Sequence, residues 1–259
     1  MIHKQTKKPV CIIDEDDKTI GRIFTRREAI KMLSATGGAI FLSACFAGQE
    51  MVQNAPAAGS NINPDCVVRP ALDEGPVFVE QELARSDIRT DTSNGVVSAG
   101  ALLDLSFRVT SIANNACTPL ENVQVDIWQC DATGVYSDTS ELGFQTVGQK
   151  FLRGYQTTDA DGMVKFITIY PGWYEGRAVH IHVKFRTPDG YDFTSQVFFD
   201  DAFTDQVFTE APYNSRGERI LRNADDGIYN ESNGQMMLNV SKTEQGYTAA
   251  TFTIALDLS

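Results

Sequence analysis

The chain has 259 residues, of which 42% are hydrophobic and 22% charged, a balance typical of a globular protein with one large or two small domains. Its formal net charge of -12 argues against nucleic acid and anionic membrane surfaces as partners. Residues 1–44 hold eight Lys and Arg against five Asp and Glu, so the rest carries 14 basic and 29 acidic residues, a net charge of -15. We therefore expect the basic start and the acidic body to be separate parts.

Residues 1–45 have the layout of an export signal, with a charged start, an apolar run over 32–42 and then small residues. The apolar run is roughly half the length of a membrane-spanning helix. The pair Arg26-Arg27 resembles a twin-arginine signal, and the letters LSAC ending at Cys45 resemble a lipobox, which would make this cysteine a lipid anchor. We expect an exported protein, periplasmic or held at the cell envelope. The alternative is that this segment is an amphipathic helix that belongs to the fold.

Residues 46–65 are small and polar without an apolar period, which predicts a flexible tether before a single domain over 66–259. In an oxidising compartment, the remaining cysteines allow one disulfide and leave one thiol. Cys117 and Cys130 flank a short turn and the strand after it, so they are the expected pair. Cys66 is the third cysteine, and spacing alone leaves all three pairings open.

The body is predicted to be all-β, because short segments with period-two patterning alternate with turn signals such as DADG at 159–162. Strands are expected over residues 103–112, 123–130, 163–170, 178–185, 193–200, 236–241 and 247–256, and one short helix over 201–210. Many short strands at this spacing favour a single β-sandwich, with long loops available to carry a site.

The segment AVHIHVKF, residues 178–185, contains His180 and His182, two of only three histidines in the chain. On a strand these two side chains share one face, about 7 Å apart along it, while the apolar residues between them face the other way. Two imidazoles at this spacing can reach one metal ion, although imidazole suits Zn, Cu, Fe and Ni alike. A merely polar strand face would give the same letters.

Two tyrosines stand near this strand in the sequence. Tyr174 lies with Arg177 in the loop YPGWYEGR before it, and Tyr136 lies in CDATGVYSD after the strand at 123–130. Each tyrosine taken singly is more often a core or surface aromatic than a ligand. Because phenol has a pKa near 10, a phenolate ligand at neutral pH requires a strong Lewis acid such as Fe(III).

Taken together, these segments resemble the intradiol ring-cleavage dioxygenases, a non-haem Fe(III) family that includes protocatechuate 3,4-dioxygenase and catechol 1,2-dioxygenase. The resemblance runs from residues 73–91 to residues 223–229. It is strongest in VDIWQCDATGVYSD, in FLRGYQTTDADGMVKFITIYPGWYEGRAVHIHVKF and in SQVFFDD. Several ordered segments that match in sequence are a far stronger signal than any one motif.

The resemblance implies a set of metal ligands for one Fe(III) per chain: Tyr136, Tyr174, His180 and His182. None of these four positions is substituted, which argues against an inactive relative. The resemblance also implies catalytic roles beside the metal. Tyr174 would leave the iron and take a proton from the substrate, Arg177 would stabilise negative charge on the ring, and Gln196 would orient substrate or peroxide.

The segment GPVFV resembles the substrate mouth of the family, which assigns substrate binding to Gly75, Pro76 and Val77. Arg85 and Arg89 follow it and either face an anionic substituent or belong to a solvated loop. Trp128 is expected in the core, and the aspartates of DADG are expected to shape a turn.

The expected reaction is cleavage of a catechol-type ring between its two hydroxyls by O2, giving a cis,cis-muconate-type diacid. The expected partners are a small aromatic diol and O2, and no nucleic acid. One alternative is an exported β-sandwich binding module without turnover. Another is a zinc hydrolase that uses the H-x-H pair, although it lacks an obvious third ligand. The identity of the catechol and the oligomeric state stay open.

Overall fold

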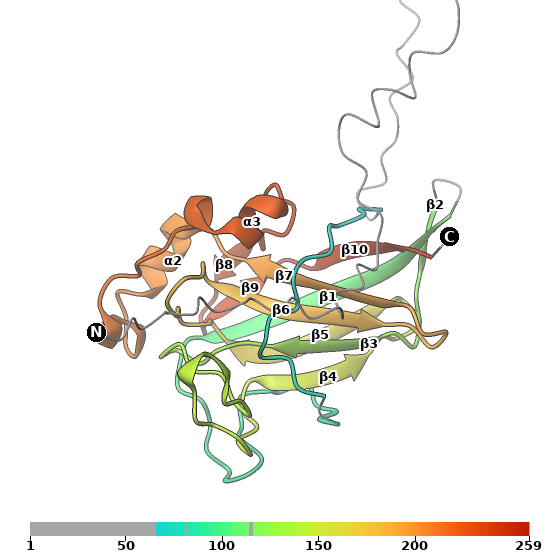
Figure 1. Ribbon diagram of the computed structural model, residues 1–259. Coiled ribbons are helices and arrows are strands. Elements are labelled where there is room, and N and C mark those ends of the chain that lie inside the picture. The colour runs from blue at the N-terminus through green and yellow to red at the C-terminus, as the bar shows by residue number, and fades with distance from the viewer. Residues whose placement is uncertain (1–65, 81, 114–115, 259) are drawn as a thin grey trace, which may run out of the picture. The chain divides into compact units, whose positions relative to one another are not determined.

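The computed structural model describes residues 66–80, 82–113 and 116–258. The expected export signal, the lipidation site at Cys45 and the tether over 46–65 lie outside the described residues. Among those that are described, no helix is both long and apolar enough to cross a bilayer. The fold consists mainly of strands arranged in two sheets, as the sequence predicted (Figure 1).

The first sheet, sheet A, is built around one long strand, β1. Its members are β1 (Leu102–Ala113), β2 (Ala116–Pro119), β5 (Met163–Ile169), β8 (Val240–Lys242), β9 (Tyr247–Ala249) and β10 (Phe252–Asp257). Strands β9 and β10 pair in parallel with successive parts of β1, while β2 and β5 pair antiparallel with it. Side chains of β1 and β5 alternate between buried and more exposed positions, as expected for a sheet with one face on the core.

The second sheet, sheet B, is antiparallel throughout and has the order β4-β3-β6-β7. Its members are β3 (Gln124–Trp128), β4 (Arg153–Thr157), β6 (His180–Arg186) and β7 (Asp192–Phe198). In this register His182 lies opposite Trp128 on one side and Gln196 on the other. Because directly paired residues share a face, these three side chains form one row across the sheet.

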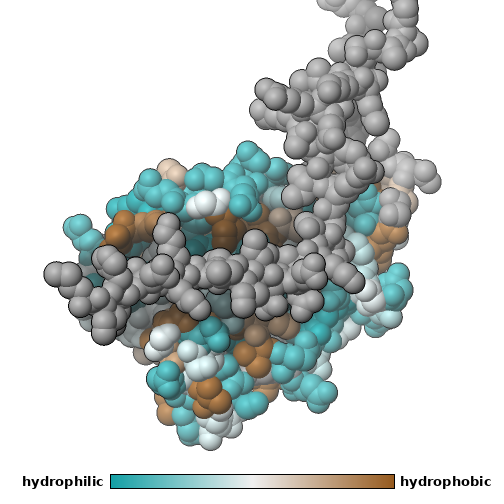
Figure 2. Space-filling model, in the orientation of Figure 1, coloured by the Kyte–Doolittle hydropathy of each residue, from teal (hydrophilic) through white to brown (hydrophobic). Residues whose placement is uncertain are grey.

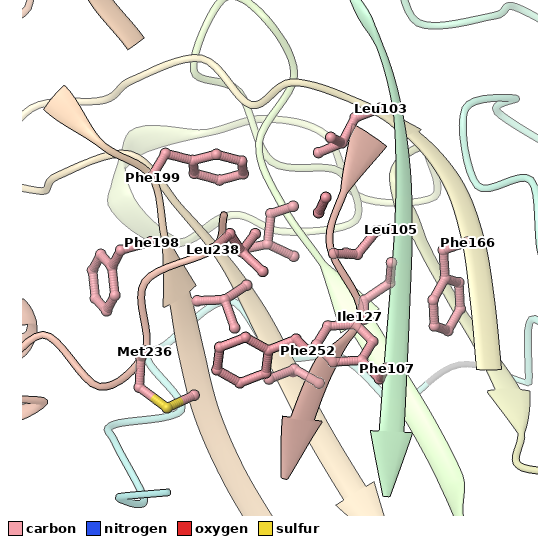
Figure 3. Packing of buried hydrophobic residues seen from close by; sticks show 14 of the residues in the cluster. Leu103, Leu105, Phe107, Ile127, Phe166, Phe198, Phe199, Met236, Leu238 and Phe252 are labelled. Carbon is pink, nitrogen blue, oxygen red and sulfur yellow. The ribbon is translucent and has the colours of Figure 1, made fainter. Parts of the chain in front are cut away.

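The apolar core lies between the two sheets (Figure 3). The Phe107 ring of β1 stands 5.9 Å from the ring of Phe185 on β6 and 6.2 Å from that of Phe252 on β10, both edge to face. Ile181 and Val183 of β6 are fully buried in the same cluster. The apolar set of the histidine strand therefore points into the core, and its histidines point to the opposite face.

Short helices lie at one end of the strands, together with the loop that follows β3 (Figure 1). They are η1 (Glu141–Gly143), α2 (Asp201–Val207), η2 (Tyr213–Arg216), η3 (Asn223–Asp225) and α3 (Gly227–Glu231). The Asp200 side chain caps α2 by accepting from the Phe203 amide, and Asp226 caps α3 by accepting from the amides of Ile228 and Tyr229. The helix predicted after residue 200 is confirmed.

Most predicted strands are present, with three differences. The strand predicted over 247–256 is divided into β9 and β10, which pair with different parts of β1. The segment 236–241 is strand only at its end, in β8, and Met237 makes a single bridge to Phe198. Strands β2 and β4 were not predicted, because ACTP is short and ends in proline, and RGYQT contains a glycine and few apolar residues. The predicted turn is confirmed, since the Asp159 carboxylate accepts from the amides of Asp161 and Met163.

The predicted disulfide between Cys117 and Cys130 is wrong. The structure pairs Cys66 with Cys117, with Cα atoms 5.4 Å apart, and leaves Cys130 as a buried thiol. Cys117 belongs to β2 in sheet A, whereas Cys130 follows β3 in sheet B, so the turn between them crosses from one sheet to the other. The segment after Cys66 instead runs beside β10, where the Ala255 amide donates to the Val67 carbonyl.

Candidate metal centre

The outer face of β6 is buried at its histidines, although outer faces of sandwich sheets normally meet water. His180 and His182 are 2% and 1% exposed. A second apolar cluster covers this face, and it consists of Val77, Trp128, Cys130 and Tyr136 with Phe78, Phe144 and Tyr174 packed against it. Hydrophilic residues cover much of the described surface that is visible in Figure 2. The burial of two imidazoles under aromatic side chains is therefore particular to this part of the surface, and the residues around it have to explain it.

Four polar side chains converge at this cluster. The Nε2 atoms of His180 and His182 are 3.1 Å apart, and the Tyr136 hydroxyl lies 3.3 Å from His180 Nε2. The Tyr174 ring stands edge to face with Tyr136, at a centroid distance of 5.5 Å, and with His180 at 5.7 Å. The two imidazole rings lean toward one another, with centroids 4.7 Å apart, closer than the spacing along an ideal strand.

The two imidazoles have the electronic state that metal ligands require. Burial, with the nearby charge of Arg177 as a second cause, lowers the pKa of His180 to about 3, and burial likewise lowers the pKa of His182 well below its ordinary value. His180 Nδ1 lies 2.6 Å from the Ala178 carbonyl oxygen and so donates to it, which leaves the Nε2 lone pair facing the cluster. His182 Nδ1 is buried with no hydrogen-bond partner among the described residues.

The two phenols require a cation in order to ionise. Burial raises the pKa of Tyr136 well above its ordinary value and that of Tyr174 to about 12. Two neutral imidazole nitrogens and two phenol oxygens form a donor set that suits a hard, strongly acidic ion such as Fe(III). Within the described ranges, no group of three or more His, Cys, Asp or Glu side chains could hold a metal.

The loops that carry the two tyrosines are packed backbone to backbone. A Cβ at Gly134 would overlap the Trp173 carbonyl, and a Cβ at Gly172 would overlap the carbonyls of Asp131 and Ala132. The Gly172 amide also donates to the Asp131 carbonyl at 3.0 Å. These contacts explain the glycines of ATGVY and YPGWY, since only glycine lets the two loops approach so closely.

Arg177 and Gln196 meet beside this cluster. Arg177 Nη2 donates to Gln196 Oε1 at 2.6 Å, and Gln196 Nε2 donates to the Asp73 carbonyl at 2.7 Å. Gln196 is fully buried, so its side-chain amide is fixed at both ends. Arg177 also forms an ion pair with Asp226, at 2.9 Å from Nε to Oδ2.

The segment predicted as the substrate mouth lies against the histidines. A Cβ at Gly75 would stand 3.4 Å from His182 Cε1, Val77 is buried in the aromatic cluster, and Pro76 is exposed. Arg85 and Arg89 are engaged elsewhere. Arg85 donates to the backbone carbonyls of Thr90, Lys150 and Arg153, and Arg89 pairs with the Asp87 carboxylate.

The sequence did not predict the place of two residues in this site, Trp128 and Asp226. Trp128 is buried as predicted, but its ring stacks on His182, with centroids 4.8 Å and planes 9° apart. Strand register was the signal that could have found this contact. Asp226 lies in the last segment of the resemblance, but no pattern connects it with Arg177, which lies 49 residues earlier in the sequence.

The comparisons with known proteins agree on one family. The family model described as Dioxygenase matches residues 73–226. The protocatechuate 3,4-dioxygenase beta chain of Burkholderia cepacia is 29% identical over 160 residues, covering 57% of this chain and 67% of that protein. The chain belongs to the intradiol ring-cleavage dioxygenases. It is therefore an enzyme, and both the predicted family and the predicted all-β sandwich are confirmed.

Solved structures of the family show the same fold. An intradiol ring-cleavage dioxygenase from Tetranychus urticae has a TM-score of 0.66 and 28% identity, covering 74% of this chain and 95% of that one. The dioxygenase domain of a dioxygenase carbohydrate-binding protein fusion from Streptomyces sp. SirexAA-E has a TM-score of 0.54 and 30% identity, covering 74% of this chain and all of that domain.

Proposed function

We propose that this dioxygenase binds one Fe(III) per chain through Tyr136, Tyr174, His180 and His182. The substrate is a catechol-type diol, which the enzyme cleaves between its two hydroxyls with O2 to a cis,cis-muconate-type diacid. The observation that carries the proposal is the convergence of two neutral imidazoles and two phenols in one buried cluster. Bound Fe(III) would act as a Lewis acid that lowers the pKa values of the phenols and of the diol hydroxyls.

The two tyrosines have different roles in this proposal. Tyr136 is fully buried and its hydroxyl lies against His180, so it would stay in place. Tyr174 is half-buried on the loop before β6. Because it can move toward solvent at lower cost, Tyr174 would yield its place to the diol. Its phenolate would accept one of the two protons that the diol loses, and a hydroxide from solvent would accept the other.

Arg177 would act on the bound ring, and Gln196 would hold Arg177 in place. Arg177 uses Nε and Nη2 for Asp226 and Gln196, and a guanidinium has five N–H groups, so donors remain to face the substrate. A fixed positive charge stabilises negative charge that develops on the ring, and burial makes it more effective. Gln196 holds the guanidinium in place, and the Asp73 carbonyl holds Gln196.

The reaction is tested with the iron-loaded full chain, 18O2 and a panel of catechol, protocatechuate and hydroxyquinol. We expect one O2 consumed for each diol cleaved, and a diacid that contains both labelled oxygen atoms. The His182→Ala variant serves as the control and should consume none. Bound iron with no O2 uptake on any of the three diols would favour the binding module. A zinc-loaded protein that ignores all three would favour the hydrolase.

We also propose export through the twin-arginine route with lipidation at Cys45. The support is the layout of residues 1–45 and the acidic charge of the body. A disulfide between Cys66 and Cys117 is consistent with an oxidising compartment. Fractionation of cells that express the chain and its Cys45→Ala variant should find only the parent chain in the membrane fraction, and a cytoplasmic parent chain would contradict export.

A further inference from the structure

We propose that Asp226 is a positioning residue of this active site, which aligns both Arg177 and the metal-ligand candidate His180. The inference rests on the proposed function. It assigns a role to the segment over η3 and α3, which contributes no metal ligand.

The Asp226 carboxylate is almost fully buried and is surrounded by N–H donors. Its Oδ2 atom accepts from Arg177 Nε at 2.9 Å and from the Ala178 amide at 2.7 Å. Its Oδ1 atom accepts from the amides of Ile228 at 2.8 Å and Tyr229 at 3.0 Å. Burial raises the pKa of this carboxyl, but these hydrogen bonds and the Arg177 charge outweigh it, so the pKa is lowered and the group is ionised.

One consequence concerns the direction of the Arg177 guanidinium. The Arg177 side chain is 17% exposed and could otherwise turn toward water. The ion pair with Asp226 holds Nε, which aims Nη2 at Gln196 and brings the positive charge close enough to act on the Tyr174 phenol. Since a planar guanidinium is fixed by two contacts at its edges, loss of the Nε contact frees the whole group to rotate.

A second consequence concerns the orientation of His180. Asp226 binds the N–H of Ala178, and His180 Nδ1 donates to the carbonyl of the same residue. Ala178 is thus held at both of its backbone polar groups. The partner of Nδ1 fixes the tautomer and the ring direction of a metal-ligating histidine. In addition, Tyr229 of α3 packs edge to face on Phe198, 5.3 Å away, and Phe198 lies 6.0 Å from the His180 ring.

The position requires a carboxylate, because all four partners are donors. An asparagine has one acceptor oxygen and an amino group. In Asp226→Asn the amino group must face either Arg177 and Ala178 or the first turn of α3. The variant keeps the size of the side chain and loses the ion pair, so it separates positioning from packing.

The matched control is Asp200→Asn at the start of α2. Asp200 also caps a short helix, and its carboxylate accepts from the Phe203 amide at 2.8 Å. Asparagine is as good a helix cap as aspartate, so this change should leave both activity and iron content as they are. Asp200→Asn therefore shows how the loss of one charge at a helix cap, by itself, affects activity and iron content.

The first measurement is kcat and KM for the iron-loaded full chain, with kcat divided by bound iron. We expect Asp226→Asn to lower kcat per iron by about 10- to 100-fold with a smaller change in KM, as for other groups that orient ligands. Asp200→Asn should match the parent chain. In an Arg177→Gln background, Asp226→Asn should cost much less than it does alone, because most of its effect passes through Arg177.

The second measurement does not depend on turnover. Hydrogen exchange, read by mass spectrometry, should become faster in a peptide over residues 173–182 for Asp226→Ala and stay unchanged for Asp200→Ala, because only Asp226→Ala removes the acceptor of the Ala178 amide. The proposal is overturned if Asp226→Asn keeps the parent kcat per iron, if its effect adds fully to that of Arg177→Gln, or if exchange is unchanged in Asp226→Ala. A parent chain that cleaves no diol would instead refute the proposed function.

Discussion

The outer faces of the two sheets differ in how deeply their side chains are buried. In sheet A the strand β5 alternates, with Lys165 and Ile167 exposed on the outer face and Val164 and Phe166 buried. In sheet B the outer face of β6 is buried where it carries His180 and His182, and half-buried further along, at Lys184 and Arg186. Two polar side chains that are fully buried on the outer face of a sheet have a role beyond the packing of the core.

The cost of that arrangement shows why it indicates function. A buried polar group destabilises the fold unless it is hydrogen-bonded. Gln196 is bonded at both ends of its amide, while His182 Nδ1 and Trp128 Nε1 are buried without hydrogen-bond partners among the described residues. Apolar residues on this face would give a more stable sheet, so the polar row across β3, β6 and β7 is explained by the site it builds.

The largest effect is expected from His182→Ala on the outer face of sheet B. We predict the loss of bound iron and of all O2 uptake, because the variant removes one of four ligand candidates. Lys165→Ala on the outer face of sheet A is the control and should bind iron like the parent chain. The measurement is iron analysis after desalting. A His182→Ala variant that keeps its full iron content would contradict the placement of the metal site on sheet B.

The next effect concerns the face that the two sheets share. Phe107→Ala should lower the free energy of unfolding by about 3–5 kcal/mol, the range for large-to-small changes in a core. Urea unfolding followed by circular dichroism measures the loss. The protein that remains folded should still bind one iron per chain, because the Phe107 ring contacts core rings and not the ligand candidates. Iron loss with an unchanged unfolding curve would show that iron binding depends on the packing of Phe107 in the core.

A somewhat smaller effect is expected from removal of the disulfide. Cys66→Ser with Cys117→Ser opens a link across 51 residues and should lower the free energy of unfolding by about 2–4 kcal/mol. Reductant should destabilise the parent chain by a similar amount and leave the double variant unaffected. The iron content should not change, because β2 belongs to sheet A. If reductant has no effect on the parent chain, this pairing is wrong.

The smallest effect is expected on the exposed face of sheet A. Ile167→Thr keeps a β-branched side chain, so the free energy of unfolding should change by no more than about 0.5 kcal/mol, as is usual for surface positions. Thermal melting and iron analysis together make the measurement. A large loss of stability would mean that this face is covered in the full chain and that the two sheets are more alike than their burial indicates.

Much of the fold could be predicted because the signals were local. The period-two patterns of β1, β5 and β6 and the DADG turn depend only on neighbouring residues. The strands that were missed are short and weakly apolar, and β4 is recognisable only because it pairs with β3. The disulfide was predicted wrongly because spacing in the sequence does not tell which sheet a strand joins.

The ligand candidates could be named because the sequence resembles a family, and because H-x-H places two histidines on one face. The contacts that surround them depend on the tertiary fold. Trp128 reaches His182 through strand register, and Asp226 reaches Arg177 from a distant helix. No local pattern marks such a residue, since a capping aspartate looks the same wherever its helix is placed.

The central claim is that phenolate and imidazole ligands hold Fe(III) on the outer face of sheet B. The most direct test is a visible absorption spectrum of the iron-loaded full chain, before and after addition of catechol under nitrogen. We predict a tyrosinate-to-iron charge-transfer band that gives a wine-red colour, that shifts when the diol displaces Tyr174, and that returns to its starting form when O2 is admitted. A colourless protein whose spectrum ignores catechol would contradict the account.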